Sequence, residues 1–225
     1  MTDPTPTLTR TWTSVLFDLD GTLTDSAPGI TSSLVSTFTQ LGLPVPDEDA
    51  LLAYVGPPLK DSLQRFAGMT EAEANAAVEI YRTFANDNDL QDNAVIPGIL
   101  GLLRDLNAAG IPIAVATSKP ESRARRILEH FGLAEHFTVI AGAGDDGSRA
   151  SKADVIAHAL AQLGADGLDL EHVVMVGDRS HDVIGAEVNG IPAIMVEWGY
   201  GSPTEATGAI AVVYAIDQLH NLLLG

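Results

Sequence analysis

The sequence predicts an α/β fold, a doubly wound parallel sheet with a Rossmann-like core and a small all-helical cap inserted after the first strand. Short apolar runs bounded by polar or glycine-containing turns occur at residues 14–19, 113–117 and 172–177. Such runs are typical of strands buried on both faces of a parallel sheet. Segments with helical periodicity lie between most of the apolar runs. This alternation indicates helical crossovers between parallel strands.

A long region without predicted strands follows the first strand. Residues 1–12 are polar and predict a loose tail. Beyond the first strand, apolar residues at helical spacing predict helices. These helices are expected within residues 30–43, 49–68 and 70–89. We therefore expect a helical cap at residues 26–93, inserted into a core formed by residues 1–25 and 94–225.

Local signals mark several helix boundaries. Thr70 and Glu73 have the spacing of a capping box. Pro97 and Gly98 are suited to open a helix, and Gly110 to end it. Strands are expected at residues 14–19, 113–117, 137–141, 172–177 and 192–196. Five parallel strands joined by right-handed helical crossovers would form one sheet with the cap over its carboxyl edge.

The composition limits the classes of partner. A net charge of -18 argues against nucleic acid and anionic membranes, because a negative surface repels polyanions. The chain has no cysteine, which excludes thiolate ligands and fits a reducing compartment. Neither a secretion signal nor an apolar run of about 18 residues is recognisable. We expect a cytoplasmic protein, and the sequence does not indicate its oligomeric state.

Two carboxylates follow the first predicted strand. Asp18 and Asp20 are two residues apart, so in an extended segment they lie on one face while Leu19 points to the other. Ligands of open α/β sheets bind at the carboxyl ends of the strands. There, one carboxylate can attack phosphorus and a second can transfer a proton. The pair therefore predicts phosphoryl-transfer chemistry.

Carboxylates that face a phosphate need a cation between them. Magnesium suits this place because it binds one or two carboxylates together with water and phosphate oxygens. Asp178, after the fourth strand, is the expected additional ligand, and Asp182, one helical turn later, can brace the ligands. The phosphoryl oxygens need fixed donors as well. Thr117 offers a hydroxyl, Ser118 an amide N–H and Lys152 an ammonium group.

Four ordered motifs resemble those of the haloacid dehalogenase superfamily, nearest its phosphoglycolate-phosphatase-like branch. They are residues 18–22 (DLDGT), 117–119 (TSK), Lys152 and 177–182 (GDRSHD). The resemblance implies that Asp18 is the nucleophile and a metal ligand. It implies that Asp20 is the general acid/base, with its backbone carbonyl on the metal. It also implies that Thr117 and Lys152 bind the phosphate, that Asp178 binds magnesium, and that the cap closes over a small phosphate ester.

Other polar residues have simpler interpretations. Lys119 is interpreted as a solvated neighbour of Ser118, and Arg179 either tunes the local field or lies on the surface. Candidate substrate contacts also occur in the cap, but a structural or solvated role is the simpler interpretation of each. These are Tyr54, Lys60, Arg65 and Arg82.

The leading hypothesis is a magnesium-dependent phosphatase that hydrolyses small organic phosphate monoesters through an aspartyl-phosphate. A sugar-phosphate mutase could use the same site. A receiver-type signalling protein would accept phosphate without turnover, but Asp20 and the cap argue against it. The expected partner is a small phosphorylated metabolite. Phosphoglycolate, nucleoside monophosphates, sugar phosphates and pyrophosphate all stay open, because specificity depends on cap loops whose geometry the sequence does not give.

Overall fold

The computed structural model describes residues 12–88, 90 and 92–225 and contains a six-stranded parallel sheet in the order β5-β4-β1-β6-β7-β8. The strands are β1 (Ser14–Phe17), β4 (Ile113–Pro120), β5 (Val139–Ala143), β6 (Val173–Gly177), β7 (Ala193–Val196) and β8 (Ala211–Val213). The first five confirm the strands expected from apolar runs. No apolar run predicted β8, because this three-residue edge strand is only partly buried and its apolar run is too short to stand out.

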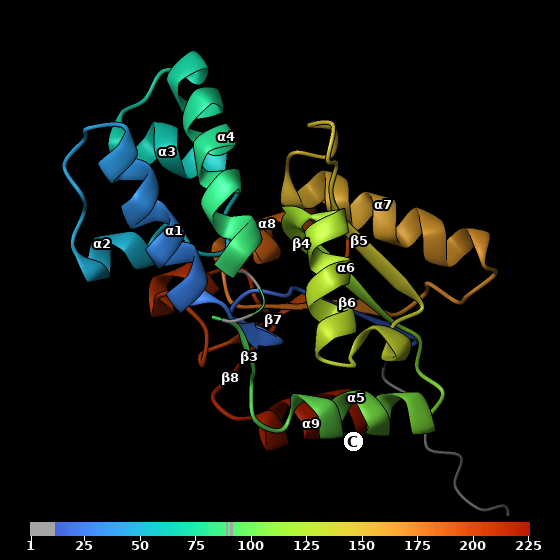
Figure 1. Ribbon diagram of the computed structural model, residues 1–225. Helices are drawn as coiled ribbons and strands as arrows, with labels where there is room; N and C mark the ends of the chain where they lie inside the picture. Colours follow the sequence, from blue (N-terminus) through green and yellow to red (C-terminus); the bar gives the residue numbers. More distant parts are fainter. Residues whose placement is uncertain (1–11, 89, 91) are drawn as a thin grey trace, which may run out of the picture.

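Helices cover both faces of the sheet (Figure 1). On one face pack α5 (Ile99–Ala108), α6 (Glu121–His130) and α9 (Ile216–Leu224). On the other face pack α7 (Lys152–Ala165) and α8 (Ser180–Val188). Along β1, Val15 and Phe17 belong to the first core cluster and Leu16 to the second. Because successive strand residues face opposite sides, the continuous apolar run of β1 supplies both cores.

A helical insert, defined here as α1 to α4, lies beyond the carboxyl edge of the sheet (Figure 1). Its helices are α1 (Ala27–Gln40), α2 (Glu48–Leu52), α3 (Leu59–Ala67) and α4 (Glu71–Asn88). They share a separate apolar cluster that includes Leu34, Val55 and Leu63. The insert begins and ends beside a short antiparallel pair, β2 (Thr24–Asp25) with β3 (Ala94–Val95), which the sequence analysis did not predict.

One expected helix of the insert is interrupted. The segment at residues 49–68 forms α2 and α3, with turns between them. Gly56 has a positive φ of 98° and two prolines follow it, so the helix cannot continue there. The capping box before α4 is confirmed, since the Thr70 amide donates to Glu73 Oε2 at 2.8 Å and the Glu73 amide donates to Thr70 Oγ1 at 3.4 Å.

The N-terminal tail is only partly described. Residues 1–11 of the expected loose tail lie outside the described residues. Trp12 does not fit the expectation of a loose tail, because it is half-buried against the core and its indole N–H donates to the carbonyl of Leu222 at 3.0 Å. The described residues also form two 3-10 helices, at Ala134–His136 and Pro203–Ala206.

The sheet changes winding direction between β1 and β6. From β1 the chain continues to β4 and β5 on one side, and from β6 it continues to β7 and β8 on the other. Connections that diverge in this way leave a crevice at the carboxyl ends of the two central strands. Asp18 and Asp178 directly follow these strands, so the fold places both carboxylates at that crevice.

Candidate functional site

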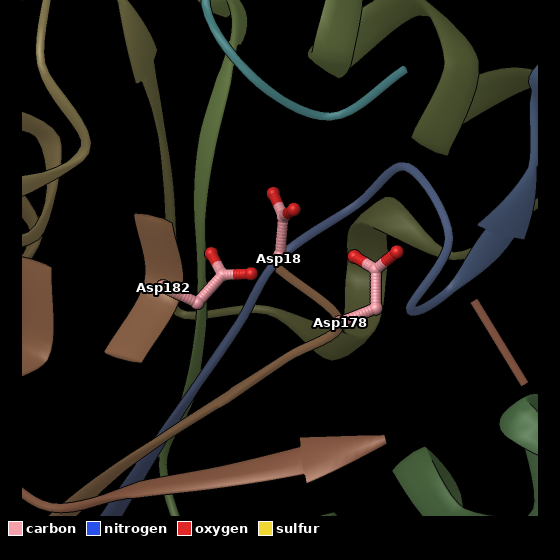
Figure 2. A group of neighbouring side chains, drawn as sticks. All are labelled: Asp18, Asp178 and Asp182. Carbon is pink, nitrogen blue, oxygen red and sulfur yellow. The ribbon is translucent and has the colours of Figure 1, made fainter. Parts of the chain in front are cut away.

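Three aspartates form a buried cluster at the crevice. Asp18 follows β1, Asp178 follows β6, and Asp182 lies in the first turn of α8. Each supplies a carboxylate oxygen within 4.8 Å of the others, and none of the three is more than 2% exposed. Figure 2 shows the three side chains gathered where these segments meet. We call this group the aspartate cluster.

Lys152 forms ion pairs with two members of the aspartate cluster. Its ammonium lies 2.7 Å from Asp18 Oδ1, 2.7 Å from Asp182 Oδ1, and donates to the carbonyl of Ala116 at 2.9 Å. Two ion pairs and one hydrogen bond thus hold the ammonium in place. Lys152 is the first residue of α7, and Ser151 and Asp154 form a capping box that fixes this helix start. The backbone thus holds the lysine at the cluster.

The Asp178 carboxylate is held by a backbone amide and a hydroxyl group. Tyr200 donates its amide N–H to Oδ2 at 2.8 Å, and the Thr22 hydroxyl contacts Oδ1 at 3.4 Å. A Cβ on Gly21, whose φ is +80°, would lie 2.3 Å from Asp178 Oδ2. A side chain at residue 21 would therefore displace Asp178. This explains why the first motif has glycine at this position.

The pKa values of the aspartate cluster are shifted mainly by burial. Burial raises the pKa of Asp18 to about 7, although Lys152 opposes the shift. Burial also raises the pKa of Asp178, and the neighbouring carboxylates of Asp182 and Asp18 raise it further. Burial lowers the pKa of Lys152, but Asp18 and Asp182 outweigh this effect and keep the lysine charged.

The aspartate cluster fits a divalent cation. Three ionised carboxylates beside one ammonium leave two negative charges without a partner in a buried site, and this is costly. A divalent ion would balance both charges. The available ligands are carboxylate oxygens, which hard cations such as magnesium prefer. The residues present therefore suit the predicted metal.

The structure brings the remaining predicted residues to the same edge. Thr117 is buried near the end of β4 and its hydroxyl accepts the amide N–H of Lys119 at 3.2 Å. Ser118 follows directly and lines a cavity of about 630 Å³ between the helical insert and the core. Asp20 is 5% exposed and lies outside the aspartate cluster, with its carboxylate paired to Lys119.

Two interpretations from the sequence need correction. Lys119 is not solvated: its side chain is 7% exposed and its ammonium lies 3.1 Å from Asp20 Oδ1. The signal that was missed is the place of Lys119, which directly follows Thr117 and Ser118 at the carboxyl end of β4, where ligands of such sheets bind. Arg179 is buried and contacts the carbonyl of Val55 in the insert and Glu205 in the core.

The candidate contacts in the insert separate into two groups. Tyr54 is buried and packs edge-on against Phe38, and burial raises the pKa of its hydroxyl, so its role is structural. Arg65 lies over the Phe66 ring. Lys60 and Arg82 line the cavity that reaches Ser118, and each is also paired with a glutamate of α4.

Comparison with known proteins identifies the family. The model of the haloacid dehalogenase-like hydrolase family matches residues 15–196, most of the chain. The chain belongs to this family. It resembles the 5'-nucleotidase of Pseudomonas aeruginosa, with 41% identity and 91% of each chain covered. A solved structure called a predicted phosphatase from Clostridium acetobutylicum superimposes with a TM-score of 0.89 and 40% identity, covering 95% of this chain and 98% of that one.

Another relative carries a different activity in its name. The tyrosine-protein kinase PtkA of Mycobacterium tuberculosis is 50% identical over 213 residues, covering 93% of this chain and 72% of that protein.

Relatives named phosphoglycolate phosphatase confirm the branch suggested by the sequence. Within the family, the phosphatase names support an enzyme that acts on phosphoric monoesters. None of the described helices is long and apolar enough to cross a membrane.

Proposed function

We propose that this haloacid dehalogenase-like hydrolase is a magnesium-dependent phosphatase that hydrolyses small organic phosphate monoesters through an aspartyl-phosphate on Asp18. The observation that carries the proposal is the aspartate cluster with Lys152, at the crevice between β1 and β6. A bound magnesium ion would neutralise the carboxylates and the phosphate oxygens. Asp18, Asp178 and the backbone carbonyl of Asp20 would hold it, and Asp182 would brace Lys152.

The chemistry divides into two displacements. In the first, an Asp18 oxygen attacks phosphorus, the bond to the ester oxygen breaks, and protonated Asp20 donates a proton to the departing alkoxide. In the second, water attacks the phosphorus of phospho-Asp18, the Asp20 carboxylate takes its proton, and Asp18 is released. Lys152, the Thr117 hydroxyl and the Ser118 amide would hold the phosphoryl oxygens. Asp20 returns to its starting state after both steps.

The helical insert would act as a cap, at residues 26–93, with residues 1–25 and 94–225 as the catalytic core. The cavity of about 630 Å³ between insert and core has the size of small-molecule sites. A cavity of this size favours a small phosphorylated metabolite over a folded phosphoprotein. The name of the Pseudomonas relative makes nucleoside 5'-monophosphates candidates beside phosphoglycolate. A cytoplasmic location stays a prediction from the sequence.

A phosphate-release screen with and without magnesium tests the proposal. The panel contains phosphoglycolate, nucleoside 5'-monophosphates, sugar phosphates and pyrophosphate. We expect continuing release with at least one ester in the presence of magnesium. Asp18→Asn should lower kcat by roughly a thousandfold or more, because the nucleophile is lost.

Parallel assays separate the alternatives. Conversion of a sugar 1-phosphate without net phosphate release would indicate a mutase, and stoichiometric labelling by acetyl phosphate without turnover would indicate a receiver. An assay of phosphoryl transfer from ATP to a tyrosine-containing peptide tests the activity named for the mycobacterial relative. Full activity of Asp18→Asn would contradict the nucleophile assignment.

A further inference from the structure

Asp20 has a buried cationic partner. The Lys119 ammonium lies 3.1 Å from Asp20 Oδ1, and the two side chains are 7% and 8% exposed. Charges that are shielded from solvent interact more strongly than a surface pair, because water and salt screen them less. The pair is therefore suited to fix the orientation of the Asp20 carboxylate.

Lys119 is itself held by the strand that carries the phosphate-binding motif. Its amide N–H donates to Thr117 Oγ1 at 3.2 Å. The pairing of β4 with β5 changes register between Thr117 and Pro120, which marks an irregularity at Lys119. Irregularities of this kind redirect side chains at the ends of strands. The backbone of β4 thus places the Lys119 side chain beside Asp20, in the loop that follows β1.

Lys119 and Lys152 have different partners. Lys152 pairs with Asp18 and Asp182 of the aspartate cluster, whereas Lys119 pairs with Asp20, which lies outside it. Two of the three lysines of this acidic chain are thus buried beside the two carboxylates of the first motif. An ammonium 3.1 Å from Asp20 Oδ1 can hold this carboxylate in one place beside Asp18.

We propose that Lys119 is a positioning residue that holds the Asp20 carboxylate in place while it activates the water that hydrolyses phospho-Asp18. The proposal rests on the proposed function. In this step a water proton passes to Asp20, the water oxygen bonds to phosphorus, and the bond between phosphorus and Asp18 breaks. Without Lys119, the phosphoryl group would still reach Asp18 but would leave it slowly.

Lys119→Met tests this role with p-nitrophenyl phosphate, whose leaving group needs little help from a proton donor. We expect kcat to fall by about 10- to 100-fold, within the range of acid–base catalysis. We also expect a burst approaching one nitrophenolate per chain, because phospho-Asp18 accumulates. Arg104→Met is the matched control: it removes one positive charge from an exposed position on α5 and should keep the wild-type kcat without a burst.

A double variant shows whether Lys119 acts through Asp20. Independent effects multiply in rate, whereas effects that pass through one group do not. In an Asp20→Asn background, Lys119→Met should change the decay rate of phospho-Asp18 by less than about twofold. The melting temperature of each variant is measured alongside, to separate a local effect from misfolding.

The outcomes distinguish the inference from the function on which it rests. If the wild type turns over but Lys119→Met raises KM with kcat unchanged, Lys119 binds substrate and the inference is wrong. A full multiplicative loss in the Asp20→Asn background, or a slower kcat without a burst, also overturns it. If the wild type releases no nitrophenolate with magnesium, the proposed function fails and the inference fails with it.

Discussion

At the scale of single residues, the site depends on charge balance in a buried place. Lys152 satisfies two carboxylates of the aspartate cluster, and the Asp178 carboxylate is held by the amide of Tyr200. One ammonium beside three carboxylates leaves the metal-free site with excess negative charge. Burial raises the pKa of Asp18 to about 7, and the neighbouring carboxylate of Asp182 also raises it, while Lys152 opposes the shift.

The raised pKa of Asp18 predicts how the stability of the metal-free protein depends on pH. The folded protein keeps a proton on Asp18 that the unfolded chain releases near pH 3.8. This contribution to stability is present below pH 3.8 and is lost as the pH rises through about 7. The melting temperature should therefore be lower at pH 8 than at about pH 5.5, and each kcal/mol corresponds to roughly 2–4 °C in a protein of this size.

Thermal unfolding of the wild type and Asp18→Asn at both pH values checks this contribution. The asparagine side chain of the variant does not titrate, so the variant should show a smaller difference in melting temperature between the two pH values. Magnesium should raise the melting temperature of the wild type more at pH 8 than at pH 5.5, because ions bind the folded, ionised site. Equal pH dependence in the two proteins would contradict the assignment.

At the scale of elements, Arg179 links the helical insert to the core. Its guanidinium donates to the carbonyl of Val55, in the loop between α2 and α3, and its Nε donates to Glu205 Oε2 at 3.1 Å. A Cβ on Gly56 would lie 2.9 Å from Arg179 Cγ. The start of α8, next to the aspartate cluster, is thus tied directly to the insert.

Arg179→Met should loosen this contact. A hydrogen bond from a charged donor contributes about 1.5–3 kcal/mol, so amide exchange at residues 53–56 should become at least about 10-fold faster. Hydrogen–deuterium exchange measured by mass spectrometry tests this, with α7 as an internal reference. Arg65→Met is the control, because Arg65 packs on Phe66 within the insert. Unchanged exchange at residues 53–56 would show that Arg179 does not restrain the loop.

At the scale of the whole molecule, the sheet topology explains why distant residues meet. The strand order places β1 between β4 and β6, and all three run parallel. The segments that carry Asp18, Thr117 and Asp178 therefore end at one edge. The helical insert leaves the core beside this edge and rejoins it at the β2–β3 pair (Figure 1). The cavity that Ser118 lines lies between the two parts.

The sequence was sufficient for the central features because they depend on local patterns. Apolar runs marked five of the six strands of the sheet, and the polar residues at their ends marked the edge where Asp18, Asp178 and Asp182 meet. The capping box at Thr70 was equally local. The catalytic and ligand roles of these residues stay predictions.

Features that depend on tertiary contacts were missed. The edge strand β8 has too few residues to show a period, and the β2–β3 pair joins segments far apart in the chain. Lys119 and Arg179 look like surface cations in the sequence, yet both are buried by partners that only the fold supplies. The place of Lys119 at the carboxyl end of β4 could have revealed it, whereas no local signal places Arg179 against Val55.

Identification of the phosphorylated residue tests the central claim most directly. The Asp20→Asn variant is mixed with magnesium and an ester that the wild type hydrolyses, and the reaction is quenched in acid. Reduction with borohydride then converts a phosphorylated aspartate into homoserine. Peptide mass spectrometry should then find homoserine at residue 18 and at no other aspartate. Steady phosphate release by the wild type with modification at a different aspartate, or with none at Asp18 in the trapped variant, would contradict the account.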